Sequence, residues 1–138
     1  MSEGKRTQLE RDGDVFTSMQ PLAHGQRYAL SLDGGEPLPD PRSPAQPEGV
    51  HAASRHVDPA TFRWSDHGFR PTPLDHAVIY ELHVGTFSPT GDFAGASERL
   101  DHLVALGVTH VELLPVAAFP GARGWGYDGV GLFAVHSS

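Results

Sequence analysis

The chain has no cysteine among its 138 residues. This absence excludes a disulfide framework and thiolate metal sites, so nothing in the composition requires an oxidising compartment. No apolar run is long enough to span a bilayer. The amino end, Met-Ser-Glu-Gly-Lys-Arg, leads into further polar residues and not into the short apolar core of a secretory signal. We therefore expect a cytoplasmic protein.

Basic residues are also few. The chain has 10 Lys and Arg against 17 Asp and Glu, which gives a net charge of −7. Nucleic acids and anionic membranes bind basic patches, so we expect neither a nucleic-acid nor a membrane partner. The hydrophobic content of 38% and the charged content of 20% are those of a soluble globular protein.

Signals for a metal or a cofactor are weak. The nine histidines show no paired ligand spacing such as His-Glu-x-x-His, so no metal site is predicted. The glycines at 124, 126 and 129 superficially match a dinucleotide fingerprint. That fingerprint must open a helix directly after its strand, whereas here Trp125 and Tyr127 crowd the positions where the backbone should approach phosphate. No cofactor is therefore predicted.

The first half of the chain predicts short strands and a connector. Residues 14–19 and 26–32 are predicted strands, and Asp33-Gly34-Gly35 then turns the chain. Five of the twelve prolines lie between positions 37 and 47 and favour an extended, polyproline-like backbone. The following residues, to position 75, carry isolated aromatic rings and are typical of a segment lying along a domain surface.

The second half predicts a parallel βαβ unit. Residues 77–84 and 108–115 are near-continuous apolar runs, typical of strands buried on both faces of a sheet. Between them, Asp92 is a predicted N-cap and Gly107 a predicted C′ residue of one helix. The apolar positions of this helix follow the i, i+3, i+4, i+7 rule.

The loop 123–129 follows the second strand and carries Trp125, Tyr127 and Asp128 among glycines. Aromatic faces stack on pyranose rings and a carboxylate accepts hydroxyl hydrogen bonds, so this loop predicts a sugar site. The alternative is a loop that only packs on its own scaffold.

The two predicted strands also carry polar residues. Glu81 and Glu112, near the ends of the two strands, are conceivable as a glycosidase acid/base pair, but pairing with a neighbouring Arg, Tyr or amide is the stronger reading. His83 and His110 are expected to be hydrogen-bonded core or barrel-mouth residues.

Three segments in combination resemble a known family. They are residues 78–87 (Val-Ile-Tyr-Glu-Leu-His-Val-Gly-Thr-Phe), 111–116 (Val-Glu-Leu-Leu-Pro-Val) and 119–130 (Phe-Pro-Gly-Ala-Arg-Gly-Trp-Gly-Tyr-Asp-Gly-Val). Together they look like maltooligosyltrehalose trehalohydrolases of the α-amylase superfamily, and the Pro-rich segment 38–51 looks like that family's join between an immunoglobulin-like sandwich and the catalytic barrel. Branching enzymes share the first two segments, but they usually have Gln where this chain has Asp128 and lack the Phe-Pro-Gly-x-Arg run.

The resemblance implies a retaining glycosidase that cleaves the α-1,4 bond next to a terminal trehalose of maltooligosyltrehalose, or acts on a related α-1,4-glucan. Such an enzyme uses an Asp nucleophile and a Glu general acid about 5 Å apart. Both are expected beyond Ser138, so no catalytic residue is assigned in this chain. Tyr127 matches the family's sugar-stacking tyrosine, with Asp128 and Trp125 beside it as further substrate-binding residues.

The predicted fold class is α/β with a preceding all-β piece. We expect 1–38 to be the last strands of an incomplete immunoglobulin-like β-sandwich, 39–76 a Pro-rich connector, and 77–138 the first βαβ and following loop of a (β/α)₈ TIM barrel. A whole barrel needs about 250 residues, so the chain is expected to be a fragment. The alternatives are a fragment of a glycogen branching enzyme, which is a glucanotransferase, and a non-catalytic glucan-binding remnant.

Overall fold

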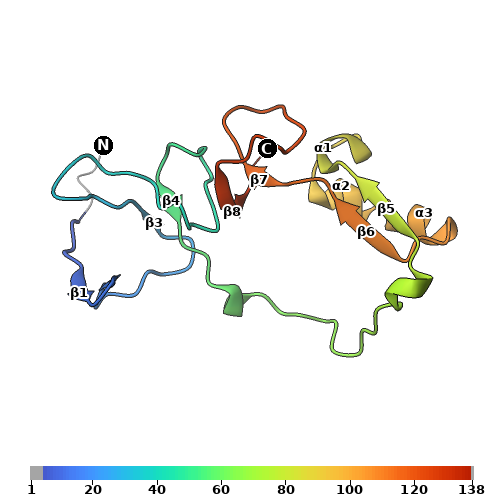
Figure 1. The fold of residues 1–138 in the computed structure, drawn as a ribbon, viewed down its shortest axis with the longest axis horizontal. Coiled ribbons are helices and arrows are strands. Elements are labelled where there is room, and N and C mark those ends of the chain that lie inside the picture. Colours follow the sequence, from blue (N-terminus) through green and yellow to red (C-terminus); the bar gives the residue numbers. More distant parts are fainter. Residues whose placement is uncertain (1–4, 138) are drawn as a thin grey trace.

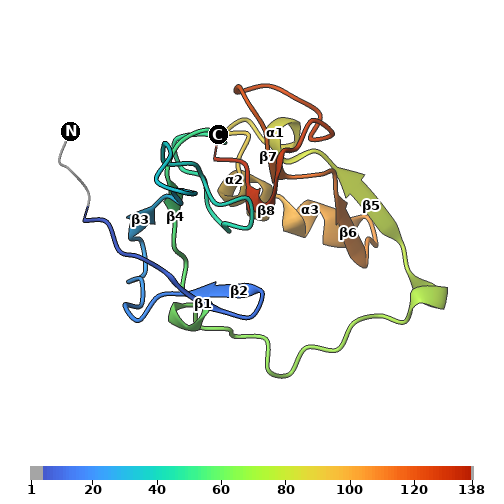
Figure 2. The same cartoon turned by 60° about the vertical axis from the view of Figure 1, so that its left-hand side comes forward.

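A computed structural model describes residues 5–137 of the chain. Residues 1–4 and Ser138, at the outer ends of the predicted segments 1–38 and 77–138, lie outside the described residues. In Figures 1 and 2, strands β1 to β4 form one group of elements and β5, β6 and the helices form another. In Figure 1 the β7–β8 hairpin lies between the two groups, and in both views a long segment joins β4 to β5.

All strands are short and pair in twos. The antiparallel pairs are β1 with β2, β3 with β4, and β7 with β8, whereas β5 and β6 are parallel. The strands are β1 (Glu10–Asp12), β2 (Val15–Thr17), β3 (Arg27–Tyr28), β4 (Ser54–Arg55), β5 (Ile79–Leu82), β6 (His110–Leu113), β7 (Ala117–Ala118) and β8 (Gly131–Val135). The helices are α1 (Val84–Phe87), α2 (Phe93–Ser97) and α3 (Leu100–Ala105), with 3₁₀ turns η1 (Pro59–Thr61) and η2 (Leu74–His76). Within residues 5–137, no helix is both long and apolar enough to cross a bilayer.

The two predicted amino-terminal strands are present but shorter than expected. Strand β2 lies inside the predicted range 14–19 and pairs with β1, which the sequence did not predict. Only β3 forms within 26–32, and beyond it Leu30 makes a single antiparallel bridge to Leu38. The predicted turn is confirmed, because Asp33 and Gly34 have φ of 51° and 75°.

The predicted connector 39–76 is not uniform. Its first part folds against β3, where β4 forms and the hydroxyl of Ser54 is fully buried. Ser54 Oγ accepts hydrogen bonds from the Asp40 backbone N–H at 2.9 Å and from Gln46 Nε2 at 2.7 Å, and Tyr28 donates to Asp40 at 2.6 Å. Buried polar groups need such partners, so this network fixes the Pro-rich backbone in place. The domain boundaries themselves stay a prediction.

The parallel βαβ unit is confirmed, with Ile79 opposite His110 and Leu82 opposite Leu113. The predicted helix is interrupted, because α2 ends at Ser97 and α3 begins at Leu100. Ser97 Oγ donates to the carbonyl of Phe93 at 2.8 Å, the back-bonding that weakens and bends helices. Helix α1 was not predicted.

The two helical caps were predicted correctly. The Asp92 carboxylate accepts from the Gly95 N–H at 2.7 Å, as an N-cap does. Gly107 has φ of +80°, the left-handed conformation of a C′ residue.

Burial on both faces is expected of these strands in a whole sheet, and within the described residues they are covered only in part. Leu82 of β5 and Leu103 of α3 are buried, but Ile79, Val111 and Leu113 are about half exposed. A parallel sheet is normally covered on both faces, and the residues described here cover these strands only in part.

The β7–β8 hairpin was also not predicted. It buries Ala118, Phe119 and Ala134, and its strand β8 makes a parallel bridge to the Pro-rich segment, Ala45 to Val135. Beside this bridge, the guanidinium of Arg42 lies 5.5 Å from the ring centroid of Phe133. The hairpin therefore joins the Pro-rich segment to the βαβ unit.

Candidate functional site

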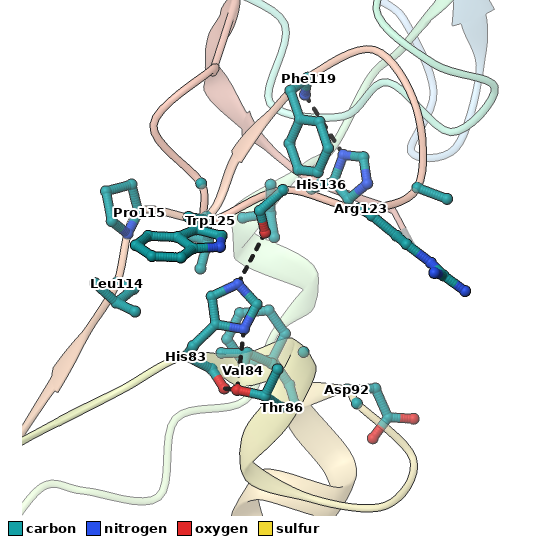
Figure 3. Close-up of a pocket in the computed structure, with 18 residues that line it drawn as sticks. His83, Val84, Thr86, Asp92, Leu114, Pro115, Phe119, Arg123, Trp125 and His136 are labelled. Atoms are coloured by element: carbon teal, nitrogen blue, oxygen red, sulfur yellow. Dashed lines mark hydrogen bonds between the residues drawn. The ribbon is translucent and has the colours of Figure 1, made fainter.

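A pocket of about 730 Å³ lies at the carboxyl ends of β5 and β6 (Figure 3). Its wall comes from residues 83–86 after β5, 91–93 at the start of α2, 114–116 after β6, Phe119, the loop residues 122–126, and residues 135 and 136 at the end of β8. The carboxyl ends of parallel strands are where α/β proteins bind small ligands. The sequence predicts a sugar site at this end of the strands, and that site stays a prediction.

The three predicted substrate-binding residues are not all in this pocket. Trp125 lines it, and its side chain is 80% exposed, so the indole is free to contact a ligand. Tyr127 is 67% exposed and Asp128 is exposed, and neither is part of the pocket wall. The structure thus brings Trp125 to the pocket and leaves the other two on the outer part of the loop.

Three glycines allow the loop to lie close to the chain that follows β6. A Cβ on Gly126 would lie 1.8 Å from the carbonyl oxygen of Pro115, and one on Gly129 would lie 2.6 Å from Cβ of Ala117. A Cβ on Gly124 would lie 3.1 Å from the ring of Phe119. The glycine pattern that superficially matched a dinucleotide fingerprint therefore serves close backbone packing.

His83 joins the end of β5 to this loop. Its Nε2 lies 3.0 Å from the carbonyl oxygen of Gly124, and its Nδ1 lies 3.4 Å from the hydroxyl of Thr86. A carbonyl only accepts, so Nε2 carries the proton. The Thr86 hydroxyl lies 3.4 Å from Nδ1 and also donates to the His83 backbone oxygen at 3.4 Å. The expectation of a hydrogen-bonded residue at the mouth of the strands is confirmed for His83.

The ring of His136 stacks on Phe119 at a centroid distance of 3.8 Å and an angle of 9°. Its Nδ1 accepts from the Phe119 backbone N–H at 3.4 Å, and its Nε2 is buried without a partner among the described residues. The sequence analysis did not predict this pair. It noted Phe119 only as part of the Phe-Pro-Gly run of the family resemblance. The stacked rings form part of the pocket wall.

Asp92 is the one carboxylate that the described residues contribute to the pocket wall. It accepts hydrogen bonds from the Gly95 N–H and from the Thr90 hydroxyl, at 2.7 and 2.8 Å. These two bonds, the one from Gly95 first, hold the pKa of the Asp92 carboxyl below its ordinary value.

We expect Asp92→Ala to lower thermal stability at neutral pH, because α2 loses its cap. The pKa of the Asp92 carboxyl is lower in the folded than in the unfolded protein, so its cap stabilises the fold fully above the unfolded-state pKa. This stabilisation is lost as the pH falls through the folded-state pKa. The difference in melting temperature between wild type and variant should therefore shrink below about pH 4. Thermal melts between pH 3 and 7 would check this, and a constant difference would contradict it.

Glu81 and Glu112 lie directly opposite each other in the parallel register. Both are exposed, and neither lines the pocket or joins a salt bridge within residues 5–137. The expected Arg, Tyr or amide partner is not seen for either side chain in this part of the chain. The same residues contain no cluster of three His, Cys, Asp or Glu side chains able to hold a metal ion.

Comparison with known proteins found no matching family model. The chain is 59% identical over 109 residues to a malto-oligosyltrehalose trehalohydrolase of Arthrobacter ramosus, covering 79% of this chain and 19% of the relative. Other proteins of that name match at 43 to 56% identity. A branching enzyme of Vibrio cholerae is 35% identical over 156 residues, covering 98% of this chain and 21% of the relative.

A crystal structure from Salmonella typhimurium, provisionally named an alpha amylase, matches with a TM-score of 0.86 and 44% identity, covering 94% of this chain and 22% of that one. The resemblance drawn from the sequence motifs is confirmed by these similarities. The chain spans about a fifth of the length of the relatives it matches.

Proposed function

We propose that this chain, a relative of the malto-oligosyltrehalose trehalohydrolases, is part of a glycoside hydrolase of the α-amylase superfamily. The proposed reaction is cleavage of the α-1,4 bond next to the terminal trehalose of a maltooligosyltrehalose, which releases trehalose. The observation that carries this proposal is an open pocket at the carboxyl ends of two parallel strands, with the exposed indole of Trp125 on its wall. Identity of up to 59% to trehalohydrolases supports the choice of reaction.

In the proposed enzyme, β5, α1 to α3 and β6 are the opening βαβ unit of a (β/α)₈ barrel. The half-exposed side chains of Ile79, Val111 and Leu113 support this placement, because neighbouring strands and helices of a barrel would cover them. Strands β1 to β3 are proposed to be the last part of an immunoglobulin-like sandwich. The proposed location remains the cytoplasm, since nothing in the composition asks for an oxidising compartment.

Trp125, Tyr127 and Asp128 are proposed to bind the glucan. An indole or phenol ring offers a flat apolar face to a pyranose, and the carboxylate accepts hydrogen bonds from sugar hydroxyls. Trp125 already lines the pocket, whereas Tyr127 and Asp128 reach a sugar only if it extends to the outer part of the loop. The carboxylic acids that break the bond are proposed to come from other parts of the enzyme.

We expect Tyr127→Ala, in the full-length protein, to lower kcat about tenfold with a smaller rise in KM, because a ring at the cleaved sugar orients the distorted substrate. Asp128→Asn should act in the same direction but less strongly. Steady-state kinetics on maltotriosyltrehalose would measure both variants.

Trp64→Ala is the matched control, since Trp64 is an exposed aromatic residue of the connector outside the pocket wall. A rise in KM with unchanged kcat for Tyr127→Ala would contradict this prediction. It would indicate that the ring contacts a sugar farther from the cleaved bond.

The second candidate function is that of a branching enzyme, favoured by the match to the Vibrio cholerae protein. The two activities differ in product. A trehalohydrolase releases trehalose from maltotriosyltrehalose, whereas a branching enzyme forms new branch points in amylose without releasing trehalose. Incubation of the full-length protein with each substrate would decide between them. Binding of glucan with neither product would favour a non-catalytic glucan-binding protein.

A further inference from the structure

The loop that carries Trp125 is held in place by its backbone neighbours. We call residues 123–129 the Trp125 loop. The indole is 80% exposed and therefore anchors the loop only weakly. The positions on either side are fixed instead, because Gly126 lies against the Pro115 carbonyl and Gly124 lies against the Phe119 ring and accepts the hydrogen bond from His83.

Among the contacts that hold the Trp125 loop, the hydrogen bond from His83 to Gly124 is the directional one. Packing of glycine against a neighbour limits how close the loop comes, whereas an N–H to carbonyl bond of 3.0 Å also fixes its orientation. The imidazole is itself constrained on two sides. The Thr86 hydroxyl lies 3.4 Å from Nδ1, and a Cβ on Gly85 would lie only 2.9 Å from Cε1 of the ring. Figure 3 shows the His83 ring below the Trp125 indole, with hydrogen bonds at both nitrogens.

We propose that His83 is a positioning residue for sugar binding: through its bond to Gly124, it orients the Trp125 indole over the pocket. His83 also lines the pocket, and the effect proposed here is the one that it exerts through Trp125. The inference rests on the proposed function, because it takes an α-1,4-glucan as the ligand. The bond between His83 and the loop is nevertheless testable without any sugar.

The first test measures loop mobility by limited proteolysis of the full-length protein. Trypsin cleaves after Arg123, which is exposed and precedes Gly124 in the loop, and after Arg99, which lies outside it. Loss of one hydrogen bond worth about 1 kcal/mol should speed cleavage after Arg123 about fivefold relative to Arg99 in His83→Leu. His83→Gln, which keeps a side-chain N–H donor, should restore part of the protection.

His102→Leu is the matched control, since His102 is an exposed histidine of α3 outside the pocket wall. It should leave the ratio of the two cleavage rates unchanged. An unchanged ratio in His83→Leu would overturn the inference. Equal acceleration at Arg99 and Arg123 would also overturn it, because His83 would then be a general structural residue.

The second test measures the affinity of the full-length protein for maltopentaose by titration calorimetry. His83→Leu and Trp125→Ala should each weaken binding about three- to tenfold, as expected for one lost contact of this kind. If His83 acts through the indole, the double variant should bind as weakly as Trp125→Ala alone. Additive losses would overturn the inference. Wild-type protein that does not bind maltopentaose would contradict the proposed function, while the proteolysis result would still test the bond.

Discussion

Residues 1–138 alone are expected to release no trehalose from maltotriosyltrehalose. A retaining glycosidase needs two carboxyl groups about 5 Å apart, one as nucleophile and one as general acid. Within the described residues, the pocket wall offers one carboxylate, Asp92, whose Oδ1 caps α2, so the wall lacks the second carboxyl group. Removing a catalytic nucleophile alone costs roughly a millionfold in turnover in well-studied hydrolases, so the expected rate is that of the blank.

The measurement is trehalose released per mole of chain, compared with a boiled sample and with the full-length protein as the positive control. Release above the boiled sample would contradict the prediction. It would direct attention to Glu81 and Glu112, the carboxylates paired across β5 and β6, and the variants Glu81→Gln and Glu112→Gln would then identify the reacting group.

Gly126→Ala is expected to have the largest effect on stability of any substitution in the Trp125 loop. Gly126 has φ of +92°, and a Cβ there would lie 1.8 Å from the backbone oxygen of Pro115. The positive φ alone costs an alanine about 1 to 2 kcal/mol, and the overlap with rigid backbone adds to this cost. We expect a total loss of at least about 3 kcal/mol, or a loop displaced from the pocket.

The chain offers a matched control in Gly107→Ala. Gly107 has φ of +80°, but a Cβ there would meet nothing within 4 Å. It therefore reports the cost of the backbone conformation without the overlap. Denaturant unfolding of both variants in the full-length protein would separate the two contributions, and equal losses would show that Pro115 moves aside without cost.

The elements predicted correctly are those whose signals are local. Asp92 and Gly107 carry the residue types that caps require, and the apolar runs around β5 and β6 have the length and composition of buried parallel strands. The break between α2 and α3 was missed because the hydroxyl of Ser97 bonds back to its own helix, which the apolar spacing does not reveal.

The elements that were missed depend on distant partners. Strand β7 is only Ala117–Ala118 and has no β-branched residue, so its pairing with β8 follows from tertiary contacts and not from propensity. Strand β4 is Ser54–Arg55 and forms where the buried hydroxyl of Ser54 meets Asp40 and Gln46.

The same distinction applies to the candidate site. The composition of its loop singled out Trp125, which the structure places on the pocket wall, while its binding of sugar stays a prediction. The partner of His83 could not be predicted, because Gly124 lies 41 positions away and accepts through its backbone. The presence of a histidine at position 83 does not indicate which distant backbone carbonyl its side chain contacts.

The bridge between Ala45 and Val135 also has a consequence for the order in which the chain folds. These two residues are the ends of a loop that contains the rest of the connector and the whole βαβ unit. Contacts of such wide sequence separation form late, because the entropy of closing the loop is lost before the contact is gained. During synthesis, the Pro-rich segment must therefore leave the ribosome long before the hairpin it pairs with. We expect the contact between Ala45 and Val135 to form only after β8 has been made, whereas the contacts of the same segment with Tyr28 and Ser54 close much shorter loops and form earlier.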